Sequence, residues 1–231
     1  MGPRMSQLHY IGVEHFDLNG EVKLDRLLKD LKPDVILMEA SQEDLATGSR
    51  FLPALRRAFR KHRVDHSVGM AYIESWAGVK AYELRASKRY CASNGAQLGF
   101  LEDLATLSDE DLANGAEGAA VNLTSRKVTV AQIKKSSEEL QRQTERRYMA
   151  AIEAIESGEE AAFLGKLEEL YTGLIGKRDV VMGDKIRSVK TVNTERKIAT
   201  ITGFIHLLTD PLEKSMYCLT RDLCPERHIL V

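Results

Sequence analysis

The chain has 231 residues, of which 43% are hydrophobic and 29% charged, and its formal net charge is −1. This composition is typical of one or two globular domains, and it excludes a strongly basic surface built for nucleic acid. No apolar run approaches the roughly 20 residues that cross a bilayer, and the N-terminus lacks the apolar core of a signal peptide. The three cysteines form no metal-type pair, so the sequence predicts a cytoplasmic protein with free thiols.

Strands and helices alternate along the first hundred residues of the predicted fold. Apolar runs predict strands at 8–12, 34–38 and 96–101, and helical spacing predicts helices over 21–31, 43–62 and 72–93. The first strand, helix and strand form a βαβ unit, which implies parallel pairing with a right-handed crossover.

Helices dominate the rest of the chain. An acidic loop with a helical turn is predicted at 108–117, helices over 125–156, 159–174 and 178–189, and strands at 197–202 and 216–219. We therefore expect a single α/β domain over 1–231. It would have a mostly parallel central sheet flanked by helices, and a helical insertion over 104–176 before the last core strand.

The same short motif, Gly-x-x-His, follows two of the predicted strands, once from Gly12 to His15 and once from Gly203 to His206. Glycine permits a tight turn or a close backbone approach, and histidine is a common metal ligand and acid or base. Because ligands of open α/β sheets bind beyond the carboxyl ends of the strands, both imidazoles are predicted to share one site. The alternative is that each histidine caps a turn.

Two other predicted strands end in carboxylates, at Glu39 and Glu102. Carboxylates are rarely buried unless they are paired or bound to a metal. Two imidazoles and two carboxylates at one sheet edge suit a divalent ion of the Mn, Co or Zn type, which could activate a water molecule. For Glu39, the alternative is a neighbour of a helix cap at Ser41.

Charged residues at two further places bear on function. Arg178 and Asp179 open a predicted helix, where an arginine can clamp a carboxylate or stabilise an oxyanion, although a surface ion pair is the alternative. The basic stretch 56–63 is interpreted as a solvated helix face, because no aromatic residues are interleaved as in stacking sites for nucleic acid.

In their order, these motifs resemble the TraB/Tiki group of proteins, which is related more distantly to erythromycin esterase and ChaN-type proteins. The matching segments are both Gly-x-x-His motifs, the strand 33–39, the helix around Glu83, the strand ending at Glu102 and the helix start at Arg178. The resemblance spans about residues 8–208. It implies an α/β core in which both motifs and the acidic residues form one site, with metal-dependent proteolysis or another hydrolysis as the chemistry.

The chain also departs from that group. It lacks the signal peptide and C-terminal membrane helices of many relatives, so extracellular ligand processing is not expected. Glu14 does not stand directly after the glycine, where the esterase branch has its glutamate, and this argues against macrolide esters as substrates.

The sequence thus predicts a metal-dependent hydrolase of an amide or ester bond in a small molecule or peptide. The predicted metal ligands are His15, Glu102 and His206. Glu39 or Glu83 would be the general base, and Arg178, with Asp179 beside it, would hold the substrate or stabilise the oxyanion.

Two other functions stay open at this point. One is a non-catalytic binding or regulatory protein on the same scaffold, with the charged helix 125–156 as a partner or homodimer surface. The other is a protein that binds haem or another cofactor through a histidine. No nucleic acid or membrane partner is expected.

Overall fold

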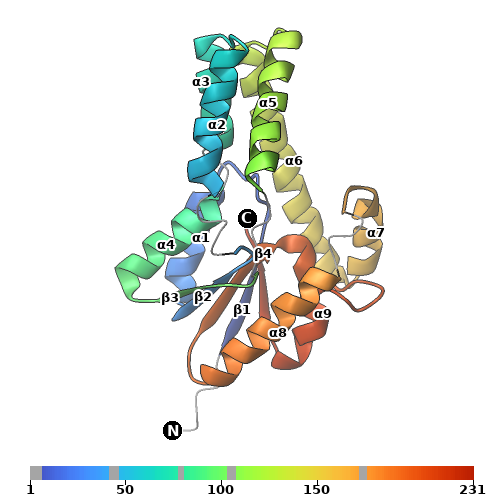
Figure 1. The fold of residues 1–231 in the computed structure, drawn as a ribbon. Coiled ribbons are helices and arrows are strands. Elements are labelled where there is room, and N and C mark those ends of the chain that lie inside the picture. Colours follow the sequence, from blue (N-terminus) through green and yellow to red (C-terminus); the bar gives the residue numbers. More distant parts are fainter. Residues whose placement is uncertain (1–6, 42–46, 78–80, 103–107, 172–175) are drawn as a thin grey trace.

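A sheet of five parallel strands forms the centre of the molecule (Figure 1). The computed structural model describes residues 7–41, 47–77, 81–102, 108–171 and 176–231. The strands are β1 (Leu8–Val13), β2 (Val35–Met38), β3 (Gln97–Phe100), β4 (Ile198–Gly203) and β5 (Glu226–Ile229). Their order across the sheet is β3-β2-β4-β1-β5, and every neighbouring pair is parallel. The predicted α/β class is confirmed.

Helices cover both faces of this sheet (Figure 1). One face packs against α1 (Gly20–Leu31) and α4 (Tyr82–Asn94), and the other against α8 (Lys177–Val192) and α9 (Met216–Thr220). Strands that are buried on both faces are rich in apolar residues, which is why β1, β2 and β4 stood out in the sequence.

A helical lobe stands beyond the carboxyl ends of the strands (Figure 1). It contains α2 (Thr47–Lys61), α3 (His66–Ala77), α5 (Asp109–Ser125) and the first part of α6 (Val130–Ser157), while α7 (Glu160–Tyr171) follows beside the sheet. The lobe has a core of its own around Leu55, Phe59 and Ile133. It therefore draws on the segment between β2 and β3 as well as on the predicted insertion over 104–176.

The end of the chain differs from the prediction. Residues 216–219, predicted as a strand, lie in the short helix α9, whose first turn is capped by Ser215: its Oγ accepts a hydrogen bond from the backbone N–H of Cys218. A short apolar run does not distinguish strand from helix, and the cap decides here. The fifth strand is β5 instead. Its charged sequence, Glu-Arg-His-Ile, belongs to a sheet edge rather than to a buried centre.

Three predicted boundaries in the helical segments were also wrong. The acidic stretch 108–117 is not a loop but the start of α5, where Ser108 and Asp111 form a capping box. The predicted helix 72–93 is two helices, α3 and α4, and the long charged helix begins at Val130 rather than at residue 125. The predicted positions 43–46, 78–80, 104–107 and 172–175 lie outside the described residues.

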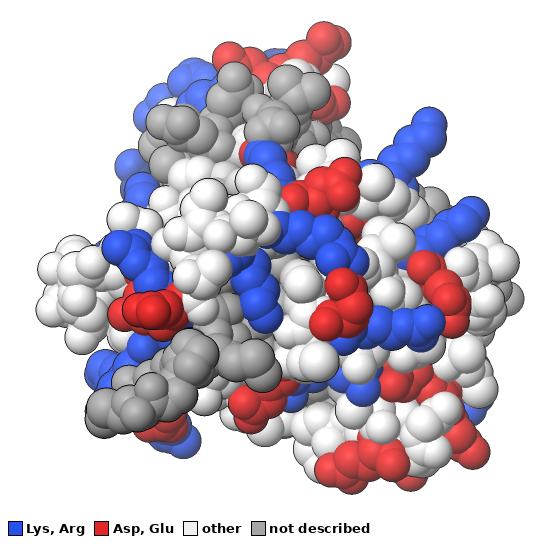
Figure 2. All heavy atoms as spheres, turned by 90° about the horizontal axis from the view of Figure 1, so that it is seen from below, with Lys and Arg blue, Asp and Glu red and all other residues white. Residues whose placement is uncertain are grey.

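The surface carries both signs of charge. Figure 2 shows Lys and Arg side chains interspersed with Asp and Glu over the face seen from below, as the net charge of −1 suggests. No helix within the described ranges is both long and apolar enough to cross a membrane.

Candidate functional site

Polar side chains from four adjacent strand ends meet at the carboxyl edge of the sheet. His15 follows β1, Glu39 follows β2, Glu102 follows β3, and His206 follows β4 in a 3-10 turn over Phe204–Leu207. With Glu83, Arg178 and Asp179 they form what we call the strand-end cluster. All seven predicted site residues thus lie in one region, connected by the contacts described next.

His206 is held from both sides of its ring. Its Nδ1 lies 2.8 Å from Oδ1 of Asp179, and its Nε2 lies 3.3 Å from Oε1 of Glu39. Burial alone would lower the pKa of His206, but the charge of Glu39 and the hydrogen bond to Asp179 outweigh it and raise the pKa to about 10. Asp179 is fully buried and also accepts hydrogen bonds from the backbone N–H groups of Met216 and Gly176.

His15 has the same arrangement on the other side of the cluster. Its Nδ1 lies 2.8 Å from Oε1 of Glu83, whose side chain is 8% exposed, whereas the His15 side chain is 52% exposed. Burial alone would lower the pKa of His15, but the hydrogen bond and the charge of Glu83 outweigh this effect and raise the pKa to about 9. In both pairs the carboxylate occupies Nδ1 and leaves Nε2 to face the cluster.

Glu39 lies at the centre of the cluster. Its Oε2 accepts a 2.6 Å hydrogen bond from the backbone N–H of Gly203, and its Oε1 lies 2.8 Å from a guanidinium nitrogen of Arg178. Arg178 also binds Oε1 of Glu102, at 2.5 Å. Burial would raise the pKa of Glu39, but the charges of His206, His15 and Arg178 hold it far below its usual value.

The cluster carries an excess of negative charge. Glu39, Glu83, Glu102 and Asp179 contribute four carboxylates, and the guanidinium of Arg178 contacts two of them, Glu39 and Glu102. With neutral imidazoles, three negative charges would stay unbalanced. Protons on the two histidines, or a divalent cation at their Nε2 atoms, would reduce this excess.

The glycines of the two motifs have different tasks. A Cβ at Gly12 would lie 2.9 Å from the backbone Cα of Phe204, so this glycine allows β1 to pack against the turn that carries His206. A Cβ at Gly203 would lie 3.5 Å from Oε2 of Glu39, 3.5 Å from Nε2 of His15 and 3.6 Å from Cδ2 of His206. Gly203 therefore keeps open the space on which the three side chains converge.

A second group of metal-ligating side chains was missed in the sequence. Among the described residues, only His9, Glu226 and His228 place three possible ligand atoms within 4.8 Å of one another, so no three ligand atoms of the strand-end cluster lie that close together. We call these three residues the edge cluster. His9 lies inside a predicted strand and the other two in the unrecognised β5, so no strand-end pattern pointed to them.

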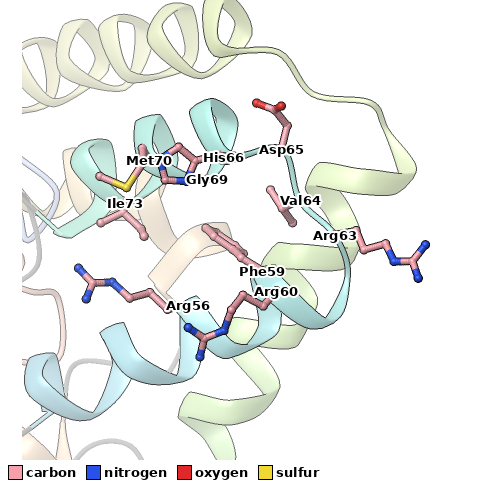
Figure 3. A pocket seen from close by; sticks show the side chains of 10 residues that line it. All are labelled: Arg56, Phe59, Arg60, Arg63, Val64, Asp65, His66, Gly69, Met70 and Ile73. Carbon is pink, nitrogen blue, oxygen red and sulfur yellow. The ribbon is translucent and has the colours of Figure 1, made fainter.

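Two cavities lie in the helical lobe. One, of about 460 Å³, is lined by Phe16 and Leu18, which follow His15, and by side chains of the lobe such as Tyr72 and Ile133. The other, of about 560 Å³, lies between α2 and α3 and is shown in Figure 3. Its apolar wall includes Phe59, and the arginines of the 56–63 stretch that line it are exposed, as predicted for a solvated helix face.

Comparisons of this chain with models of known protein families, with curated proteins and with solved structures found no match.

Proposed function

We propose that the protein is a divalent-metal-dependent hydrolase of an amide or ester bond, with the strand-end cluster as its active site. The observation that carries the proposal is the pair of imidazoles, each bound at Nδ1 by its own buried carboxylate. Metal-ligating histidines typically have such a partner, which fixes the ring and makes Nε2 more basic. The open space at Gly203 and the excess of carboxylates also support a cation at this place.

Nε2 of His15, Nε2 of His206 and the carboxylate of Glu39 would hold the ion. When bound, a divalent ion lowers the pKa of a water molecule and polarises a carbonyl group. Glu39 suits a ligand better than a general base, because its strongly lowered pKa makes it a weak proton acceptor. Glu83 and Asp179 position the two rings rather than touch the substrate.

Proton transfer falls to Glu102 in this proposal. Hydrolysis adds water across the acyl bond, so one proton must pass from the water to the departing amine or alcohol. Glu102 comes from the next strand end, its side chain is 14% exposed, and Arg178 fixes it beside Glu39. Arg178, at 37% exposed, presents a positive charge for a developing oxyanion or a substrate carboxylate.

The substrate would lie between the strand-end cluster and the helical lobe. The cavity of about 460 Å³ begins one residue after His15 and is partly apolar, with Phe16, Leu18 and Leu140 in its lining. This shape suits a small molecule or a short peptide with an apolar group. The kinship with the TraB/Tiki group and a cytoplasmic location are parts of the same proposal.

A non-catalytic binding protein is the second candidate. It is favoured by the closed network around Glu39, in which Arg178, His206 and Gly203 already contact the carboxylate. Hydrolysis assays on nitroanilide and nitrophenyl ester substrates decide between the two, with chelated protein and protein reloaded with Mn²⁺, Co²⁺ or Zn²⁺. Activity that requires the metal and disappears in His206→Gln but not in His66→Gln supports the hydrolase. Equal background rates in all samples favour the binding protein.

A further inference from the structure

The edge cluster lies far from the strand-end cluster along the strands. His9 is the second residue of β1 and stands opposite Glu226, the first residue of β5, in the parallel register, and His228 stands opposite Ile11. The cluster therefore occupies the amino-terminal part of the β1–β5 pair, whereas His15 follows the carboxyl end of β1. β5 is one of the two edge strands of the sheet, so the cluster lies at a sheet edge.

The three side chains face one another at short range. Nδ1 of His9 lies 3.0 Å from Nε2 of His228 and 3.3 Å from Oε2 of Glu226, and Nε2 of His228 lies 3.6 Å from Oε1 of Glu226. Ligands at about 2.0 Å from a tetrahedral zinc ion are separated by about 3.3 Å, so these distances match the edges of such a site. Two imidazoles and one carboxylate are also a donor set that zinc accepts.

His9 presents its Nδ1 atom to the other two side chains. Its side chain is 5% exposed, and its Nε2 is buried with no hydrogen-bond partner among the described residues. Within the described ranges, the ring contacts His228 and Glu226 through Nδ1.

We infer that His9, Glu226 and His228 form a second divalent-metal site, separate from the strand-end cluster, which binds a borderline cation of the Zn²⁺ or Co²⁺ type. The metal joins the last strand, β5, to β1 across the sheet edge. The exposed Glu226 carboxylate, at 66% exposed, gives the ion access from solvent. A water molecule would complete the coordination, since the described residues offer three ligands here.

The test is the number of Co²⁺ ions bound by the full chain, without a histidine tag, after chelation and dialysis. Variants are His228→Gln and Glu226→Gln for this site, His206→Gln for the strand-end cluster, and His66→Gln as a matched control. Circular dichroism of the metal-free proteins checks folding, and Glu226→Gln changes a largely exposed residue that the fold tolerates.

We expect His228→Gln to bind one ion fewer than the wild type and His66→Gln to bind the same number. Glu226→Gln should bind the edge ion at least about tenfold more weakly. His206→Gln tests the proposed active site separately, through the loss of one ion relative to the wild type. A folded His228→Gln or Glu226→Gln variant that binds Co²⁺ with wild-type number and affinity would overturn the inference, whatever His206→Gln does.

Discussion

The strand-end cluster and the edge cluster both bring two histidines and a glutamate together, yet their electrostatics are opposite. In the strand-end cluster, each imidazole has a different buried carboxylate at its Nδ1, and the pKa values of His15 and His206 rise to about 9 and about 10. In the second, the rings face each other beside one exposed carboxylate, and the pKa values of His9 and His228 fall. Protons therefore compete with a metal at the strand ends, whereas at the sheet edge the imidazoles are neutral near pH 7.

The difference follows from position in the sheet. At the strand ends, Glu83 on α4 and Asp179 on α8 are buried behind the rings, and such carboxylates orient a reactive centre. The edge strand has solvent on one side, so its carboxylate stays exposed and no second carboxylate contacts His9 or His228 among the described residues. The first arrangement suits catalysis, and the second suits a cross-link between strands.

The largest expected effect separates the two clusters by activity. His206→Gln should lower hydrolysis by about 10²-fold or more, because it removes a ligand that the buried Asp179 orients. The loss of hydrolytic activity in His228→Gln should be at least about tenfold smaller than the loss in His206→Gln. Steady-state rates at saturating metal give the comparison, and comparable losses in both variants would contradict the assignment of catalysis to the strand ends.

Glu102 tests how roles are divided within the strand-end cluster. As a proton acceptor, Glu102→Gln should lower kcat by about 10²-fold while the metal Kd changes less than about tenfold. As a metal ligand, which the sequence predicted, the same change would weaken metal binding instead. Measuring kcat and metal Kd on one preparation distinguishes the two roles.

The two motif glycines offer a matched pair. Gly12→Ala should cost about 1–3 kcal/mol of unfolding free energy, because its Cβ would lie 2.9 Å from the Phe204 backbone. Gly203→Ala meets only contacts of 3.5 Å or more, so its stability should change by less than about 1 kcal/mol. Its metal affinity should nevertheless fall about tenfold, since the new methyl group fills the space between the ligands. Urea denaturation measures the stability and metal titration the affinity. If Gly203 were only a packing residue, Gly203→Ala would lower the stability and leave the metal affinity unchanged.

The smallest effect concerns pH. A histidine whose folded pKa is raised stabilises the fold below its unfolded pKa of about 6.5, and this contribution disappears as the pH rises through the folded value. The metal-free protein should thus lose stability between about pH 6.5 and pH 10, mainly through His206, since water screens the half-exposed His15. The melting temperature of His206→Gln should depend less steeply on pH over this range than that of the wild type. An unchanged dependence would argue against a protonated His206.

Acidification tests the edge cluster with the opposite sign. Because the pKa values of His9 and His228 are lowered in the folded state, these histidines bind fewer protons there than in the unfolded state below about pH 6.5. Their contribution to stability is complete above this pH and decreases on acidification, with Glu226 and Lys197 as the charges that modulate His9. His228→Gln should reduce the loss between pH 6.5 and pH 5, while His66→Gln should not.

The sequence predicted the sheet best where the strands are buried on both faces. β1, β2 and β4 are rich in apolar residues and buried, and the polar residue after each strand pointed to the strand-end cluster. β5 was not predicted, because it is an edge strand with the sequence Glu-Arg-His-Ile, and the edge cluster was missed for the same reason. The capping box of Ser108 and Asp111 was a readable signal for α5 that the acidic composition concealed.

The site itself could be predicted in its members but not in its pairing. That Glu83 would bind His15 and that Asp179 would bind His206 depends on how α4 and α8 pack onto the sheet, which no local pattern encodes. The lowered pKa of Glu39 likewise depends on the charges around it, so the proposal that it is a ligand rather than a general base needed three-dimensional contacts.

The most direct test of the central claim is a crystal structure of the protein grown with Co²⁺, with the metal located by anomalous scattering. The account predicts a peak bounded by Nε2 of His15, Nε2 of His206 and the carboxylate of Glu39, with bonds of about 2.0–2.2 Å. A fully loaded crystal with no peak there, and with Arg178 still bridging Glu39 and Glu102, would contradict it.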